Sequence, residues 1–314
     1  MSAYLPTTVN AALSALATTA ATLLLAFAVS RVRPLRAARA AAWGLVPAAV
    51  VAADHVTAVE PPGFRMLALV AGLLYSMKAL VSVEAAASEG TRLPPLRWLA
   101  FATLWPGMRP GLFASLGPPR SGARRLLARG LAGAALGGAL VALARLAWNA
   151  TGSAALASVA LLPGLSLMLH FGAFDAIAGL WRLAGVDCGP LFRAPLRSAS
   201  LSEFWGRRWN LAFSEMTALA VYRPLSEAAD ARVGLGAAFL FSGLLHEVAI
   251  SLPVRAGLGL PSLYFAIHGG LVLIERERGP LGRSATLVSL VVPLPLLFHP
   301  SFLRGVLWPL LGRP

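Results

Sequence analysis

Apolar residues run through this sequence in stretches of about 20, separated by short segments that carry charges, glycines and prolines. A helix of about 20 apolar residues is long enough to cross roughly 30 Å of hydrocarbon. The pattern therefore predicts an all-α polytopic membrane protein with about eight transmembrane helices. The expected spans lie at about residues 11–30, 41–59, 64–86, 130–148, 154–180, 233–252, 261–275 and 285–308.

The composition supports this interpretation, because 57% of the 314 residues are hydrophobic and only 13% are charged. Soluble domains carry about 25% charged residues, so the composition excludes an ordinary soluble protein. The net charge of +14 would suit a nucleic-acid-binding protein, but the arginines flank apolar spans, as the positive-inside rule describes. We therefore expect no nucleic acid partner. The single cysteine, Cys188, excludes an internal disulfide and a multi-cysteine metal site.

The arginines also predict which ends of the spans face the cytoplasm. One group, at 31–39, follows the first span, and another lies in the longest non-spanning stretch, 181–231. Together with the basic loop at 120–129, both groups are expected on the cytoplasmic side, which leaves both chain ends outside. We expect residues 1–314 to form a single membrane-embedded domain in a bacterial inner (cytoplasmic) membrane.

One apolar segment, residues 97–117, differs from the spans because it is broken by "WPGMRPG" and has basic residues on both sides. Positive charge at both ends does not suit a segment that crosses the membrane. Irregular backbone at membrane depth is tolerated only where protein or a water-filled cavity covers it. We therefore expect this segment to be re-entrant or to lie at the interface.

The long stretch contains "EFWGRRWN", residues 203–210, where aromatic and polar side chains are concentrated. Helical spacing over 204–219 places one apolar stripe opposite a polar side. The stripe consists of Trp205, Trp209, Ala212, Phe213, Met216 and Leu219, and the polar side of Arg207, Asn210, Ser214 and Thr217. Such a helix suits the membrane interface, with its tryptophans at headgroup depth. An interfacial anchor does not require the amide of Asn210, so an anchor and a functional segment both remain open.

A second polar group, "FSGLLHEVAISLP" at 241–253, lies in an otherwise apolar span. Ionisable residues inside a membrane are expensive and mark function by default. Ser242 and His246 share a helical face, whereas Glu247 is about 100° away and is expected to pair elsewhere. The alternative is a structural His–Glu pair that satisfies hydrogen bonds between helices.

The two polar groups together resemble the membrane-bound O-acyltransferase superfamily, and specifically its wax-synthase-like branch. "FWGRRWN" followed by "VYRPL", then "SGLLHE" with "SLP" behind it, carry this resemblance, and "LWPGM" and "SMKAL" also fit it. It covers roughly residues 70–270, the core that bears the motifs. Sterol and diacylglycerol acyltransferases of the superfamily tend to have a histidine a few residues after "WN". Here "LAFSEM" follows, which favours the wax-synthase-like branch.

The resemblance implies transfer of a fatty acyl group from acyl-CoA to the hydroxyl of a lipophilic alcohol, as in wax-ester synthesis. His246 is then the expected general base, because imidazole can take the alcohol's proton at neutral pH. Asn210 would orient the substrate or stabilise charge at the reacting centre. The expected substrate-binding residues are Trp205, Arg207, Arg208, Trp209, Ser242 and Glu247. A thioester substrate needs no metal and no cofactor.

Two questions stay open at this point. The arginines of 182–208 either hold the phosphates of coenzyme A or simply follow the positive-inside rule. The acceptor is a fatty alcohol or, alternatively, a sterol, a diacylglycerol or the hydroxyl of a secondary metabolite.

Proteins of other classes fit the sequence less well. A transporter or lipid-binding protein would favour two related halves with interrupted helices, and no such symmetry is visible. A membrane cytochrome needs facing histidines, yet no expected span carries two of them. A membrane serine protease is disfavoured because Ser242 lacks a G-x-S-x-G motif.

Overall fold

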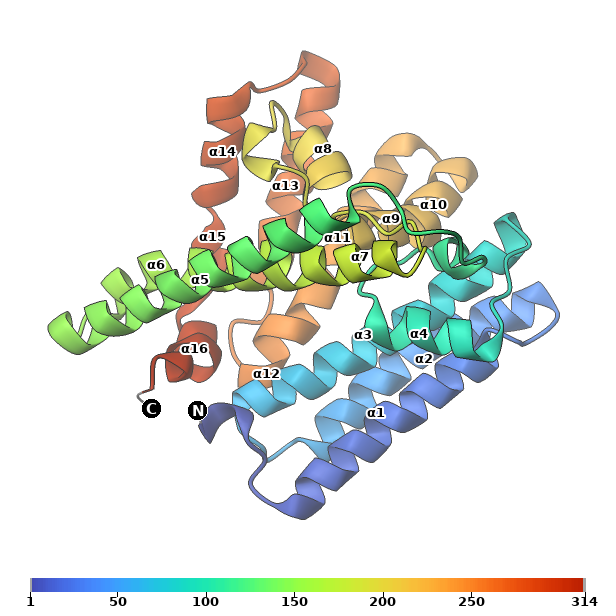
Figure 1. Cartoon of the computed structure of the whole chain (residues 1–314). Helices are drawn as coiled ribbons and strands as arrows, with labels where there is room; N and C mark the ends of the chain where they lie inside the picture. Colours follow the sequence, from blue (N-terminus) through green and yellow to red (C-terminus); the bar gives the residue numbers. More distant parts are fainter. Residues whose placement is uncertain (1, 313–314) are drawn as a thin grey trace.

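The computed structural model describes residues 2–312, and over that range the chain is built from helices and turns, without β-strands (Figure 1). The α-helices are α1 (Val9–Val29), α2 (Leu35–Val56), α3 (Pro62–Ser88), α4 (Pro95–Leu104), α5 (Ala123–Thr151), α6 (Ala154–Ser166), α7 (Phe174–Leu183), α8 (Leu201–Glu203), α9 (Leu211–Thr217), α10 (Arg223–Ala228), α11 (Ala231–His246), α12 (Leu252–Val254), α13 (Leu260–Arg278), α14 (Arg283–Val291), α15 (Leu294–Leu297) and α16 (Pro300–Phe302).

Shorter 3-10 and π-helical segments connect these helices. The 3-10 helices are η1 (Ser2–Tyr4), η2 (Pro110–Phe113), η4 (Pro195–Arg197) and η9 (Trp308–Leu311). The π-helical segments are η3 (Leu167–Ala173), η5 (Phe204–Arg208), η6 (Ala218–Tyr222), η7 (Glu247–Ser251) and η8 (Leu303–Leu307). Single π-helical turns occur frequently at functional sites. Here η5 and η7 lie next to the two polar groups that the sequence singled out.

The predicted all-α polytopic architecture is confirmed, and the spans differ from the expected ones in number. Within the described residues, six helical stretches are long and apolar enough to cross a membrane. A seventh is obtained if 283–297 and 300–311, which meet at an angle of 66°, count as one span. The expected span at 261–275 is not among them, because its helix, α13, runs on into the charged residues 275–278. By length and apolar composition the described residues thus offer six or seven candidate spans, against about eight expected.

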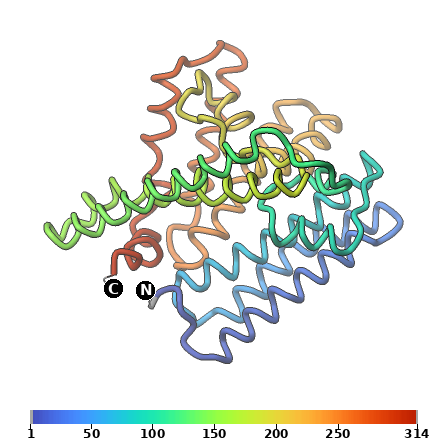
Figure 2. Tube along the Cα trace, viewed as in Figure 1, coloured from blue at the N-terminus to red at the C-terminus, as the bar shows by residue number. Residues whose placement is uncertain are grey.

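The helices form three groups that follow the order of the chain (Figure 2). Helices α1, α2 and α3 pack on one another, α5 packs on α6, η3 and α7, and α11 packs on α13. Among the candidate spans, α3 is the most enclosed. Within its apolar 18-residue stretch 61% of the residues are buried, against 17% for α1 and for α5. The N-terminal and C-terminal ends meet, because the Tyr4 hydroxyl donates to the Val306 carbonyl at 2.7 Å.

The outer faces of the bundle are apolar, as contact with lipid requires. On α1, the side chains of Leu13, Leu16 and Leu24 are 58%, 65% and 68% exposed. Contiguous exposure of this kind would be costly in water, and it has no such cost against hydrocarbon. The exposed leucines therefore mark the surface that faces the membrane.

Many arginines meet at one end of the bundle, where loops are tied to one another by hydrogen bonds to the backbone. The Arg120 amide donates to the Arg182 carbonyl at 2.8 Å, and the Arg283 side chain donates to the Leu196 carbonyl at 3.0 Å. Arg39 forms a bidentate ion pair with Glu84, with both contacts at 2.7 Å. The loops before α5 and after α7 therefore lie together at this arginine-rich end.

The broken segment consists of α4, an irregular stretch from Trp105 to Arg109, and η2. The only lysine of the chain, Lys78, is fully buried in α3 beneath it. Its ammonium donates to the carbonyls of Phe101, Trp105 and Gly107 at 3.0, 2.7 and 2.7 Å. An ammonium has three N–H donors, so this geometry uses all of them. The irregular backbone is thus covered by protein, which is the condition under which such backbone is tolerated at membrane depth.

Candidate active site

A cavity of about 320 Å³ lies between α9 and η6 on one side and α11 and α13 on the other. Most of its wall is aromatic or aliphatic. Asn210 and His246, the two expected catalytic residues, both line it although they are far apart in the sequence. Further polar residues, among them Ser202, Tyr222 and Arg276, also line the cavity.

The imidazole of His246 is held in one orientation by its own helix. Its Nδ1 lies 2.7 Å from the Ser242 carbonyl, one turn earlier on α11. A carbonyl only accepts hydrogen bonds, so in the neutral ring Nδ1 carries the hydrogen and Nε2 keeps the lone pair. The ring packs against Phe265 on α13, with the centroids 4.3 Å apart. This arrangement leaves Nε2 as a hydrogen-bond acceptor at the wall of the cavity.

Asn210 occupies a break in the backbone rather than a position within a helix. Its φ and ψ of 44° and 65° are left-handed, a conformation in which asparagine is several-fold enriched among non-glycine residues. Its Oδ1 accepts a hydrogen bond from the Phe213 amide at 3.3 Å, so Asn210 is the N-cap of α9. The Nδ2 group has no hydrogen-bond partner within residues 2–312, and the side chain borders the cavity. This amide can therefore donate to a bound molecule.

Phe213 joins the two halves of the site. Its amide is capped by Asn210, and its ring lies 5.6 Å from the ring of His246. The backbone next to Asn210 is tied to the loop before η4, because the Leu211 amide donates to the Leu191 carbonyl at 2.9 Å. The relative position of Asn210 and His246 is thus fixed by packing and backbone bonds in this part of the chain.

The prediction of one continuous amphipathic helix over 204–219 is wrong. The π-helical segment η5 ends at Arg208, Trp209 is extended (φ −105°, ψ 126°), and α9 begins at Leu211. Of the polar side of the expected helix, Asn210, Ser214 and Thr217 line the internal cavity, whereas Arg207 is exposed. The opposite side of α9 packs into the core of the bundle. Extended helical spacing cannot detect such a break, because it assumes constant rotation per residue.

Trp205 and Trp209 were expected to bind substrate, and both line the cavity. Trp209 lies between Phe192 and Phe204, with ring centroids 4.9 and 5.4 Å away. Trp205 packs on Phe265 at 5.4 Å. The two indoles therefore form a rigid aromatic wall that extends the surface around His246.

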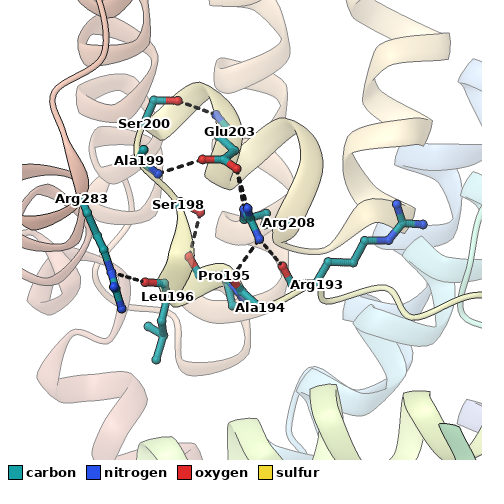
Figure 3. A network of polar contacts seen from close by, with 10 residues as sticks. All are labelled: Arg193, Ala194, Pro195, Leu196, Ser198, Ala199, Ser200, Glu203, Arg208 and Arg283. Atoms are coloured by element: carbon teal, nitrogen blue, oxygen red, sulfur yellow. Dashed lines mark hydrogen bonds and ion pairs between the residues drawn. The ribbon is translucent and has the colours of Figure 1, made fainter. Parts of the chain in front are cut away.

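Arg208 lies outside the cavity, in the network of polar contacts that Figure 3 shows. It pairs with Glu203 at 2.6 Å and donates to the carbonyls of Arg193 and Ala194. Glu203 also accepts from the Ala199 amide at 2.8 Å. The Ala199 amide first, and the Arg208 guanidinium second, hold the pKa of Glu203 below its ordinary value. Arg208 is thus a brace of the loop before η5.

Arg207 and Glu247 are not brought into the cavity either. Arg207 is exposed on η5. The Oε1 of Glu247 accepts hydrogen bonds from the amides of Gly259 and Ser262 at 3.0 and 2.9 Å, at the start of α13. Glu247 therefore caps α13, as its separation from the His246 face suggested. Ser242 does line the cavity, although its hydroxyl donates to the Ala238 carbonyl at 2.8 Å.

The sequence did not single out two residues near the end of α13, Glu275 and Arg276. Glu275 accepts from the Leu201 and Ser202 amides at 2.9 and 3.0 Å and so holds the start of α8. Arg276 lines the cavity beside Tyr222, and its guanidinium lowers the pKa of that phenol. The only signal was the dense charge of "ERERG", which the positive-inside rule already explained.

A second cavity, of about 460 Å³, adjoins the first on the other side of α9 and η6. The broken segment contributes Met108–Leu112 to it, α3 contributes Ala85, and Glu89 follows directly after α3. Arg109 forms an ion pair with Glu215 of α9 at 2.9 Å across this cavity. Burial raises the pKa of Glu215, and the charge of Arg109 opposes that shift.

Comparison with known proteins identifies relatives of the part of the chain that builds this site. Residues 188–266 match the Membrane bound O-acyl transferase family. Long-chain-alcohol O-fatty-acyltransferase of Simmondsia chinensis is 38% identical over 103 residues, which cover 29% of this chain and 28% of that protein.

Two Arabidopsis thaliana proteins give similar matches. Probable long-chain-alcohol O-fatty-acyltransferase 7 is 34% identical over 102 residues, or 30% of each chain. Probable long-chain-alcohol O-fatty-acyltransferase 9 is 32% identical over 143 residues, which cover 38% of this chain and 42% of that protein. The chain thus spans less than half of each of these relatives. The matches confirm the resemblance to the wax-synthase-like branch that the two polar groups indicated.

Proposed function

We propose that the protein is an acyl-CoA:alcohol O-acyltransferase, because residues 188–266 match the Membrane bound O-acyl transferase family. It transfers a fatty acyl group to the hydroxyl of a lipophilic alcohol and releases a wax-type ester. The observation that carries the proposal is the geometry of His246, whose Nδ1 donates to the Ser242 carbonyl and leaves Nε2 basic at an aromatic cavity.

The proposed reaction begins with the alcohol hydrogen-bonded to His246. Nε2 takes the hydroxyl proton while the oxygen forms a bond to the carbonyl carbon of the thioester. The C–S bond then breaks and the ester forms. The coenzyme A sulfur leaves with the proton that the imidazolium returns, so the histidine is neutral again. The reaction uses no metal and no cofactor, since the thioester already supplies an activated acyl group.

Asn210 supports the same reaction from the other side of the cavity. The carbonyl oxygen of the thioester gains negative charge when the alcohol attacks. The unpaired Nδ2 group of Asn210 is a neutral donor that stabilises such charge without disturbing the proton balance of His246. The N-cap bond through Oδ1 fixes the direction of that donor before substrate binds.

The acyl-CoA donor enters from the end of the cavity that Arg276 lines. The cavity wall contains this guanidinium and no carboxylate among the described residues, which suits a thioester whose nucleotide carries phosphates. The aromatic residues further in suit the acyl chain. On the same proposal, the arginine-rich end faces the cytoplasm of a bacterial cell, where acyl-CoA is present.

The test is ester formation by membranes that contain wild type, His246→Ala or His246→Gln, with acyl-CoA and a panel of alcohols. Mass spectrometry of the lipid products measures turnover. A general base contributes about 10²–10⁴-fold, so both variants are expected to lose at least about 100-fold. Glutamine fails nearly as badly as alanine because an amide does not accept a proton at neutral pH.

The matched control is His55→Gln, since His55 is exposed on α2 and does not line the cavity. It is expected to leave turnover unchanged. Well-folded His246→Gln protein with near wild-type turnover would show that the histidine is structural and would refute the mechanism.

A further inference from the structure

The two cavities share part of their walls. Gly206, Ser214 and Ala218 line both the His246 cavity and the second cavity. Ser214 and Ala218 lie one turn apart along α9 and η6, and Gly206 belongs to η5. All three residues have small side chains or none. The two cavities are therefore separated at this point by very little side-chain volume.

Gly206 is the one of these three residues that has no side chain. A Cβ atom built on it would have no heavy atom within 4 Å, so a side chain here would extend into open space. Its φ is not in the left-handed region, so the backbone does not itself require glycine. Other glycines of the chain have a clear packing reason, for example Gly130, whose added Cβ would meet Ala176 at 2.5 Å. Neither packing nor backbone conformation accounts for a glycine at 206.

We propose that Gly206 sets the width of a passage through which the alcohol acceptor reaches His246 from the second cavity. This inference rests on the proposed function and adds the route and the size limit of one substrate. The alcohol enters with its hydroxyl group first. The carbon that bears the hydroxyl, and any branch on it, therefore pass Gly206, while the alkyl chain stays in the second cavity.

The charges of the two cavities assign the acceptor to this route. The second cavity is lined by two carboxylates, Glu89 and Glu215, and two guanidiniums, Arg109 and Arg223, so its charges balance. A balanced wall suits an uncharged alcohol better than it suits the phosphates of coenzyme A. The His246 cavity has the opposite character, with a guanidinium and no carboxylate in its described wall.

The apolar part of the second cavity suits the rest of the alcohol. Met108, Leu112 and Leu219 line it beside the charged groups. Apolar side chains of this kind stabilise an alkyl chain by removing it from water. The second cavity is also larger than the His246 cavity, at about 460 Å³ against about 320 Å³.

The experiment compares Gly206→Ala and Gly206→Leu with the wild type on linear primary, branched primary and secondary alcohols at one acyl-CoA. The expected result is a KM that rises with both side-chain size and alcohol bulk, by about tenfold or more for secondary alcohols with Gly206→Leu. The KM for acyl-CoA is expected to stay at its wild-type value. Gly236→Leu is the control, because a Cβ there also meets nothing within 4 Å and the residue lines neither cavity.

The outcomes separate this inference from the proposed function. Wild-type membranes that form no ester from any alcohol would refute the proposed function and the passage with it. Ester formation with an unchanged alcohol range in Gly206→Leu would refute the passage alone. A rise in the KM for acyl-CoA, with that for alcohols unchanged, would overturn it as well, because the second cavity would then receive the donor.

Discussion

Asn210 combines a structural and a proposed chemical role, and three substitutions separate them. Asn210→Ala removes the cap of α9 and places alanine, which tolerates the left-handed region less well than asparagine, at φ 44°. The lost cap costs about 1 kcal/mol and the poorer backbone fit adds to it, so a loss of about 1–2 kcal/mol of stability is expected. Asn210→Gly accepts the backbone conformation freely, so its cost is a few tenths of 1 kcal/mol. Asn210→Asp keeps an oxygen for the Phe213 amide and is expected to be about as stable as wild type.

Turnover is expected to follow a different order from stability. All three variants lack the Nδ2 donor, and loss of one donor to a developing oxyanion costs about 10²–10³-fold in kcat. Alanine, glycine and aspartate should therefore all be slow, although only alanine is clearly unstable. The assay combines thermal unfolding of purified protein in detergent with ester formation normalised to folded protein.

The control for the cap is Ser153→Ala, because Ser153 caps α6 through a bond of the same length, 3.3 Å to the Leu156 amide. Its loss should lower stability by about 1 kcal/mol and leave kcat unchanged. The decisive variant is Asn210→Gly. A stable glycine variant with wild-type kcat would mean that Asn210 only shapes the backbone, and the proposed role of its amide would be refuted.

Two charged side chains, the half-buried Glu247 and the buried Lys78, give further predictions about stability. Glu247→Gln removes the negative charge at the start of α13, so the free energy of unfolding should fall by about 1 kcal/mol. The kcat of the folded fraction should change little. A large loss of kcat at unchanged Tm would contradict the capping role. Lys78→Met leaves three backbone carbonyls without their donor at about 1–3 kcal/mol each, so the folded yield should collapse, whereas Arg124→Met, at an exposed site, should not affect it. Normal yield and Tm for Lys78→Met would show that other groups satisfy these carbonyls.

The helical class and the two site segments followed from the sequence because each rests on a strong signal. Apolar runs of about 20 residues indicate membrane helices directly. A histidine in the middle of such a run is expensive enough to indicate function, which is how His246 was identified. That His246 lines the same cavity as Asn210 was not visible in any spacing and was expected from the resemblance alone.

The remaining differences come from features that depend on three-dimensional contacts. The break at Trp209 is specified by a left-handed Asn210 and by backbone bonds to residues distant in sequence. The bracing role of Arg208 depends on a carboxylate and two carbonyls that only the folded loop brings together. Lys78 lies in an apolar span, and its three partners belong to a segment more than 20 positions later.

A carboxylate accepts backbone hydrogen bonds at each end of helix α13. Glu247 accepts from amides at the start of α13, and Glu275, near the end of α13, accepts from amides at the start of α8. Neither carboxylate lines the cavity, so the spacing of the cavity walls is set independently of the side chains that face the substrate. Lining residues such as Leu235, Ala238 and Val272 are therefore free to vary in size without moving the walls. On the proposed function, a change of alcohol specificity would therefore require only exchanges of lining residues. The two glutamates would keep α13 and α8 in position around the cavity.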